Sequence, residues 1–305
     1  MVHQSGLIMG YLFLGLALLA GLTKAYCGKR SSHAVRGTLD AVTVTSVRML
    51  FCCVIGVILP LASCVDPLEI SQKAILLSAL SGLASACFTV SWMLAVSTTM
   101  YMMVEVFVTG GVIIPLIVSN VIYGEPITVP DIIGVLLLLV GIYLISVREK
   151  GKGEKWNIKG VLLLIFAAIS SGSVSVVQKI YTKECPDDNA LTFNLYVYVF
   201  AAIFLVAVTL ISTLKAKKKI GTAVSVVKPV IGYVAIMAVC LFLNSYFMTR
   251  AASDLDSVIL YPMNQGLAMV FSSVMSVTLF KEKLNIKGVF GIVLTIGTIV
   301  LINVF

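Results

Sequence analysis

Three ionisable side chains stand in apolar stretches of this sequence, where a charge is costly. Glu105 is surrounded by Met, Tyr, Val and Phe in MYMMVEVFVTGG, residues 100–111, and Arg48 and Lys24 stand in earlier apolar stretches. Such groups pair with one another as a structural brace, or they line a cavity. In a cavity, Glu105 would bind a proton, a cation or a cationic group of a ligand. The two cations argue equally for a zwitterion or an anion.

A second polar set follows later in the chain. YPMNQG, residues 261–266, places a proline, two amides and a glycine in an apolar stretch, which predicts a broken or bent helix beside a binding site. The alternative is a simple kink whose amides bond neighbouring helices. Tyr side chains nearby make an organic cation conceivable through cation–π contact. The candidate substrate-binding residues are Glu105, Arg48, Tyr101, Asn244, Tyr246, Tyr261, Asn264, Gln265 and Trp92, and the candidates for ion coupling are Glu105 and Lys24.

The composition indicates that lipid surrounds these residues. Of the 305 residues, 59% are hydrophobic and 12% are charged, and the mean hydropathy is +1.06. Soluble domains carry about 25% charged residues, so this chain cannot cover itself with a polar surface. The net charge of +8 comes from loops between apolar segments and not from a basic stripe with interleaved aromatics, which argues against a nucleic-acid partner.

The sequence offers no catalytic or metal-binding motif. Its two His and seven Cys show no metal-ligand spacing, HExxH is missing, and residues 21–30, GLTKAYCGKR, have the wrong spacing for a Walker motif. We therefore expect no enzyme activity, no metal and no cofactor. Cys64 and Cys185 both fall in loops, and whether they pair stays open.

Ten segments are apolar and long enough to span a bilayer, which takes about 20 residues. They cover residues 7–27, 42–62, 74–97, 100–122, 131–147, 160–180, 191–213, 230–250, 257–279 and 288–305. When the sequence is compared with itself at an offset of 157 residues, residues 124–147 align with 281–304 without a gap, and Glu125 aligns with Glu282. Each half then has five spans, and this odd number predicts an inverted repeat of the kind found in secondary transporters.

Residues 124–145, GEPITVPDIIGVLLLLVGIYLI, and 281–302, KEKLNIKGVFGIVLTIGTIVLI, resemble the drug/metabolite transporter superfamily of the EamA-like type. In that family a Gly-Glu pair precedes the last helix of each half, whereas Lys281 replaces the second Gly here. The resemblance implies an all-α integral membrane protein with ten transmembrane helices, built as two inverted five-helix repeats around a central cavity. The repeats would be residues 1–150 and 156–305.

Two further expectations concern the repeated segments. Small residues let helix backbones approach closely in lipid, so Gly134 and Gly141 on one segment, and Gly291 and Gly297 on the other, predict that the fifth and tenth segments cross there. The alternative is that these glycines are merely tolerated. Glu125 and Glu282 are expected at helix N-termini, where the helix dipole favours an anion, and are not assigned to transport.

These features predict a secondary transporter that moves a small polar or amphiphilic metabolite, such as an amine or an amino acid, by alternating access. The alternative is a membrane receptor or scaffold that binds a small ligand without transport. The expected partners are a small-molecule metabolite or drug, membrane lipid and a proton or other ion, for a monomer in the plasma or inner membrane. The loops on the side of the membrane away from the N-terminus hold 16 of the 22 Lys and Arg, which predicts that this side is cytoplasmic and that both termini are outside. The family resemblance favours the opposite orientation, with cytoplasmic termini.

Overall fold

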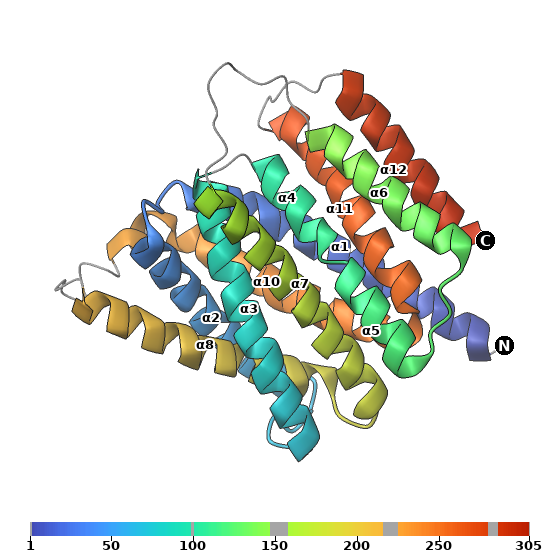
Figure 1. Ribbon diagram of the computed structural model, residues 1–305. Coiled ribbons are helices and arrows are strands. Elements are labelled where there is room, and N and C mark those ends of the chain that lie inside the picture. Colours follow the sequence, from blue (N-terminus) through green and yellow to red (C-terminus); the bar gives the residue numbers. More distant parts are fainter. Residues whose placement is uncertain (1, 99–100, 147–157, 216–224, 280–285, 305) are drawn as a thin grey trace.

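The computed structural model describes residues 2–98, 101–146, 158–215, 225–279 and 286–304 (Figure 1). The helices are α1 (Val2–Ser32), α2 (Thr38–Ala62), α3 (Gln72–Thr98), α4 (Tyr101–Gly110), α5 (Ile113–Tyr123), α6 (Val129–Ser146), α7 (Ile158–Glu184), α8 (Ala190–Lys215), η1 (Ser225–Val230), α10 (Ile231–Asp254), α11 (Ser257–Leu279) and α12 (Ile286–Val304). Within these ranges there is no strand, and seven helices are long and apolar enough to cross a membrane. The protein is therefore an all-helical integral membrane protein.

The side chains of α2 show how lipid shapes the sequence. Leu50, Val54 and Ile58 are exposed on one face, four residues apart, so they share a helix face. The opposite face is buried and also mostly apolar, but it includes Arg48 and Gly56. A helix that is apolar all round is typical of a membrane span, and its rare polar side chains turn inward because lipid offers them no partner.

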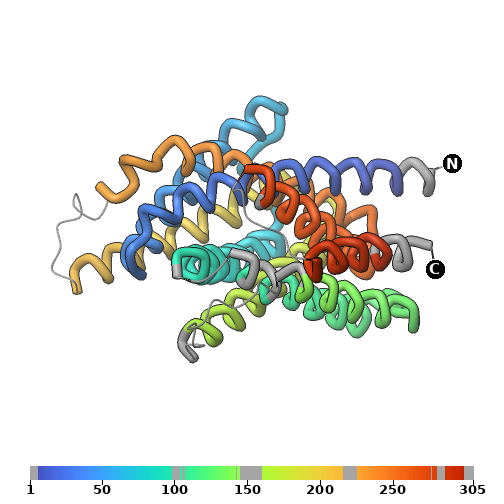
Figure 2. The backbone as a smooth tube through the Cα atoms, turned by 90° about the horizontal axis from the view of Figure 1, so that it is seen from above, coloured from blue at the N-terminus to red at the C-terminus, as the bar shows by residue number. Residues whose placement is uncertain are grey.

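Helices from the two halves of the chain pack against each other. Figure 2 shows α1 running beside α10, and α6 beside α12. The pairs α2–α8 and α3–α7 also pack closely. The start of α1 and the end of α12 lie at the same end of the molecule (Figures 1 and 2). Every one of these pairs joins a first-half helix to a second-half helix, so neither half forms a separate body.

The helix interruption lies elsewhere than expected. The segment predicted at 100–122 is two helices, α4 and α5, whereas α11 runs through Pro262 without a break. Of the broken or bent helix predicted there, the break is therefore wrong. The interruption is at Gly111, where a Cβ would collide with the carbonyl oxygen of Ala168 on α7. A Cβ on Gly172 would in turn lie 2.6 Å from the carbonyl oxygen of Gly111. Two backbones touch here, and glycine permits that approach.

A buried ion pair joins four segments at the end of the molecule where α5 ends and α11 begins. Nζ of Lys179 lies 2.8 Å from Oε1 of Glu125, and the two side chains are 2% and 7% exposed. Lys179 also donates to the carbonyl oxygens of Ala252 and Leu255 at the end of α10. Glu125 accepts from the backbone N–H of Ser257 at the start of α11, at 2.9 Å. Each charge thus meets the helix end that attracts it.

Gly124 gives the Gly-Glu pair its local structure. It ends α5 with a left-handed φ of 63°, a conformation that glycine adopts without strain. The residue after Gly124 is Glu125, and the side-chain amide of Asn120 holds it by donating to its carbonyl oxygen at 2.8 Å. The turn thereby directs Glu125 to α11, which confirms that it lies at a helix N-terminus, though not that of α6. Glu282 lies outside the described residues.

We expect Lys179→Met and Glu125→Gln each to destabilise the protein by about 3–5 kcal/mol, because each leaves a buried group uncompensated. The double variant should recover part of that loss, since it removes both charges together. Thermal unfolding of the four proteins in detergent measures the coupling. Strictly additive effects of the two substitutions would contradict a direct interaction.

The same pair predicts a dependence of stability on pH. Burial raises the pKa of Glu125, but the ammonium of Lys179 and the N–H of Ser257 outweigh burial and hold the pKa below its usual range. A lowered pKa contributes stability above the usual carboxyl range, and this contribution is lost as pH falls through the lowered pKa. Wild type and Glu125→Gln should therefore converge in stability on acidification. A constant difference would show that Glu125 is not the titrating group.

The crossing of α6 and α12 rests on glycine, as expected. A Cβ on Gly141 would lie 2.5 Å from Oγ1 of Thr295 and 3.1 Å from the carbonyl oxygen of Gly291. Gly297, expected on the same face, has no atom within 4 Å of such a Cβ, so this part of the expectation is wrong. The six-residue step from Gly291 turns Gly297 well away from the contact.

Gly141→Ala should therefore destabilise the protein by about 1–3 kcal/mol through overpacking. Gly297→Ala on the partner helix is the matched control, and its stability should stay within about 0.5 kcal/mol of wild type. Thermal unfolding in detergent compares the two variants. Equal stabilities would refute the close crossing.

Candidate functional site

A cavity of about 210 Å³ lies between the two halves of the chain. Helices α1, α2, α3 and α4 of the first half and α7, α8, α10 and α11 of the second contribute to its wall. The lining combines apolar side chains with hydroxyls, amides and two cations. A concave, partly polar space enclosed by helices is where a small molecule binds.

Arg48 is the most deeply buried charge of the cavity wall. Its side chain is 2% exposed. Nη1 donates to the thioether sulfur of Met237 at 3.3 Å, whereas Nε and Nη2 have no hydrogen-bond partner among the described residues. A thioether is a weak acceptor. Within the described part of the chain, the guanidinium therefore lacks an anionic or strong neutral partner.

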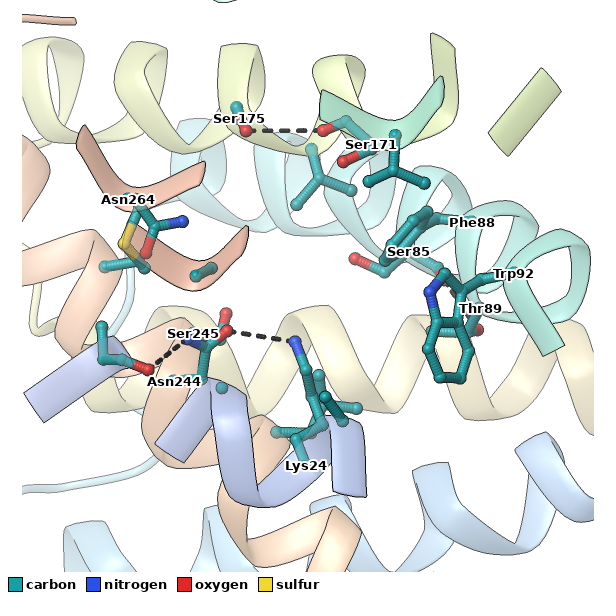
Figure 3. Close-up of a pocket in the computed structure, with 18 of the residues that line it drawn as sticks. Lys24, Ser85, Phe88, Thr89, Trp92, Ser171, Ser175, Asn244, Ser245 and Asn264 are labelled. Atoms are coloured by element: carbon teal, nitrogen blue, oxygen red, sulfur yellow. Dashed lines mark hydrogen bonds between the residues drawn. The ribbon is translucent and has the colours of Figure 1, made fainter. Parts of the chain in front are cut away.

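Lys24 supplies the second cation, from α1. Figure 3 shows its ammonium directed into the cavity, where it donates to Oδ1 of Asn244 at 3.4 Å. The amide of Asn244 donates in turn to the carbonyl oxygen of Ala17 at 2.7 Å. Gly21 makes room for this arrangement, because a Cβ there would lie 3.3 Å from Nδ2 of Asn244. This hydrogen-bonded corner positions one positive charge at the cavity surface.

The remaining wall is formed by aromatic and hydroxyl side chains (Figure 3). Phe88 and Trp92 of α3 stand with Ser85 and Thr89 opposite Asn264 of α11. Trp92 packs against α1, since a Cβ on Gly28 would lie 2.8 Å from its ring. The sequence reasoning overlooked the hydroxyls because Ser and Thr are common in membrane helices. The four-residue spacing of Ser85 and Thr89, and of Ser171 and Ser175, is the signal that was available.

A polar network supports the wall between α7, α8 and α10. The amide of Gln178 donates to the hydroxyl of Thr249 at 2.7 Å and to the carbonyl oxygen of Ser245 at 3.1 Å. The hydroxyl of Ser245 donates to Oδ1 of Asn194 at 2.6 Å. Gln178 and Ser245 also line the cavity. The network fixes these side chains, so the polar groups they present to the cavity are held in place.

The cavity gathers six of the sequence-predicted site residues: Arg48, Lys24, Trp92, Asn244, Asn264 and Gln265. Tyr246 and Tyr261 do not line it. Tyr261 is 2% exposed and donates to the carbonyl oxygen of Ser175 from behind the wall, and Tyr246 packs on Phe247 with ring centroids 5.4 Å apart. Both side chains pack against other parts of the protein because of where they lie on their helices, and the residue type alone does not predict this.

Glu105 and Tyr101 lie on α4, but their side chains are outside the described residues. The predicted contact of Glu105 with Arg48 or Lys24 therefore stays a prediction. Among the described residues that line the cavity, none is acidic, and no group of three or more His, Cys, Asp or Glu in the described ranges is arranged to hold a metal ion. Cys64 and Cys185 are free thiols. The described wall thus carries positive charge.

Comparison with known proteins gives three findings. A sequence model of the EamA-like transporter family matches residues 9–147 and 158–304. A curated relative, the quaternary ammonium compound-resistance protein QacH of Staphylococcus saprophyticus, is 35% identical over 60 residues, which are 20% of this chain and 56% of that protein. One solved crystal structure shares the fold, with a TM-score of 0.69 over 98% of this chain and 96% of the other at 15% identity.

Proposed function

The chain belongs to the EamA-like transporter family, and on that premise we propose that it is a secondary transporter moving a small polar or amphiphilic metabolite across the cell membrane by alternating access. The observation that carries this proposal is the polar cavity between the two halves of the chain. A receptor or scaffold needs only a binding site. A transporter needs a site that can open to either side of the membrane in turn.

The helix pairs support ten spans in two inverted repeats, residues 1–150 and 156–305. If the halves are repeats, α1 corresponds to α7, α2 to α8, α3 to α10 and α6 to α12. Exchanging the two repeats must then convert each observed helix pair into another observed pair. The α1–α10 pair then becomes the α7–α3 pair, while α2–α8 and α6–α12 map onto themselves, and all four pairs pack closely. Two matches of one family model, 139 and 147 residues long by their limits, also favour this division. Such symmetry supplies two access states.

The size and charge of the cavity favour a metabolite over a drug or a quaternary ammonium compound. Drug-sized ligands occupy pockets of about 300–1,000 Å³, and this cavity has about 210 Å³. The name of the relative from Staphylococcus suggests a cationic cargo, but Arg48 in the wall, with no carboxylate beside it among the described lining residues, favours an anionic or zwitterionic one. We assign the protein no enzyme activity and no cofactor, and propose a monomer in the plasma or inner membrane.

Filling the cavity should stop transport. Gly21 lines the cavity with little space before Asn244, so Gly21→Leu should lower flux at least tenfold. Gly15→Leu is the matched control on α1, because a Cβ there meets no atom within 4 Å. Counterflow of a radiolabelled metabolite panel into proteoliposomes compares both variants with wild type. Absence of any flux in wild type would favour the receptor alternative.

We propose further that Glu105 couples transport to a proton or another ion. Support comes from its position on α4, three residues before Val108, which lines the cavity. Residues three apart share a helix face. A carboxylate there would add a titratable negative charge to a wall that otherwise carries two cations.

Glu105→Gln preserves shape and removes the charge. It should flatten the dependence of flux on pH between about pH 5 and 8 or abolish transport, while the protein still folds. The measurement is the initial rate in proteoliposomes at several pH values, normalised to folded protein. An unchanged pH profile would assign Glu105 to a structural role.

A further inference from the structure

Resting on the transport function proposed above, we infer that the cavity selects a carboxylate-bearing metabolite and that Arg48 is the residue that recognises the carboxylate. The motivation is a guanidinium that is 2% exposed and stands in the cavity wall, and whose Nε and Nη2 have no partner among the described residues. A planar guanidinium binds a carboxylate through two parallel hydrogen bonds. The two unpartnered groups, Nε–H and Nη2–H, form one such fork.

The surroundings of Arg48 do not neutralise it. Among the described residues, the ionisable groups that act on it are Cys52 and Tyr198, a thiol and a phenol whose ordinary pKa values lie above neutral pH. Its hydrogen-bond partner is the thioether of Met237. A buried charge without a counterion is costly, because burial removes its hydration. An anion that enters the cavity removes this cost, so binding gains from it.

Met237 covers the guanidinium and also lines the cavity. Methionine side chains are unbranched and repack with little cost. A change in the rotamer of Met237 therefore uncovers Nη1. Nε and Nη2 are themselves buried, so a carboxylate reaches this fork only when the side chains around Arg48 shift.

Lys24 adds a second cation, from α1, to the same wall. Its ammonium points into the same space (Figure 3) and is held by Oδ1 of Asn244. Among the described residues of the wall, no carboxylate offsets Arg48, so its charge favours anions and zwitterions over simple amines. The amide side chains of Asn264 and Gln265 are the neutral acceptors available to an ammonium group of a zwitterion.

The test uses matched sets of small molecules on the wild-type protein. One set comprises L-leucine, 4-methylpentanoate, L-leucinamide and 3-methylbutylamine, and equivalent sets are built on alanine and phenylalanine. Binding is read from the fluorescence of Trp92, which lines the cavity, in a Trp156→Phe background that removes the second of the two tryptophans. In at least one set, the carboxylate members should bind at least tenfold more tightly than the amide and the amine.

Three variants assign the preference to Arg48. Arg48→Met should bind the acid and the amide equally, and Arg48→Lys should fall between Arg48→Met and wild type because it retains charge without the fork. Arg250→Met is the control, since Arg250 stacks over Phe13 and does not line the cavity; it should behave as wild type. If Arg48→Met fails to fold, the wild-type panel and Arg48→Lys still decide the question.

Tighter binding of amides or amines than of acids would overturn the inference, as would an acid preference that survives in Arg48→Met. Failure of every carboxylate to bind would overturn it as well, and would point to Glu105 as the partner of Arg48. These results differ from a failure of the transport proposal. Carboxylate binding without flux in proteoliposomes would contradict the transport proposal and support the recognition site. Flux of a probe that lacks a carboxylate would support transport and contradict the recognition site.

Discussion

The ion pair between Lys179 and Glu125 is the constraint on which the arrangement at one end of the molecule depends. It is buried, and its hydrogen bonds extend to the end of α10 and the start of α11. Four chain segments from both halves therefore have fixed positions relative to one another. The cavity wall includes residues of α7, α10 and α11, so the pair also sets the spacing of the cavity on that side. An ion pair can do this where apolar packing cannot, because it has direction as well as strength.

Lipid explains where the other polar groups lie. Apolar contacts between helices gain little in a bilayer, since lipid tails are as apolar as leucine. Association then relies on close backbone approach and on interior hydrogen bonds. Gly141 against α12 and Gly111 against α7 provide the first, and the network of Gln178, Asn194 and Thr249 provides the second. The same requirement that turns polar side chains inward also creates the polar cavity.

Sequence reasoning predicted the membrane class, most helix limits and the inward orientation of Arg48, because hydropathy over about 20 residues and the cost of a charge in lipid are local properties. It did not predict that Tyr261 lies behind the cavity wall, nor that the helix interruption falls at Gly111. Both depend on a backbone carbonyl of α7: that of Ser175 accepts from Tyr261, and that of Ala168 lies against Gly111. Such pairings join residues far apart in sequence, and residue type does not encode them.

Two buried cations among the described residues, Lys179 and Arg48, differ in how their charges are compensated. Lys179 and Arg48 are equally buried, each 2% exposed. Lys179 meets a carboxylate and two helix-end carbonyls, so its charge is compensated from within the chain and has no need of a ligand. Arg48 meets a thioether, and its Nε and Nη2 have no partner in the part of the chain that the structure describes. A fold that can compensate one buried cation so fully has the means to compensate the other. Arg48 is kept unsatisfied beside a cavity, and strained or unsatisfied groups of that kind concentrate at functional sites. In the recognition site inferred for Arg48, the cost of the uncompensated charge would be the source of selectivity, because an anion would relieve it and a cation or a neutral molecule would not.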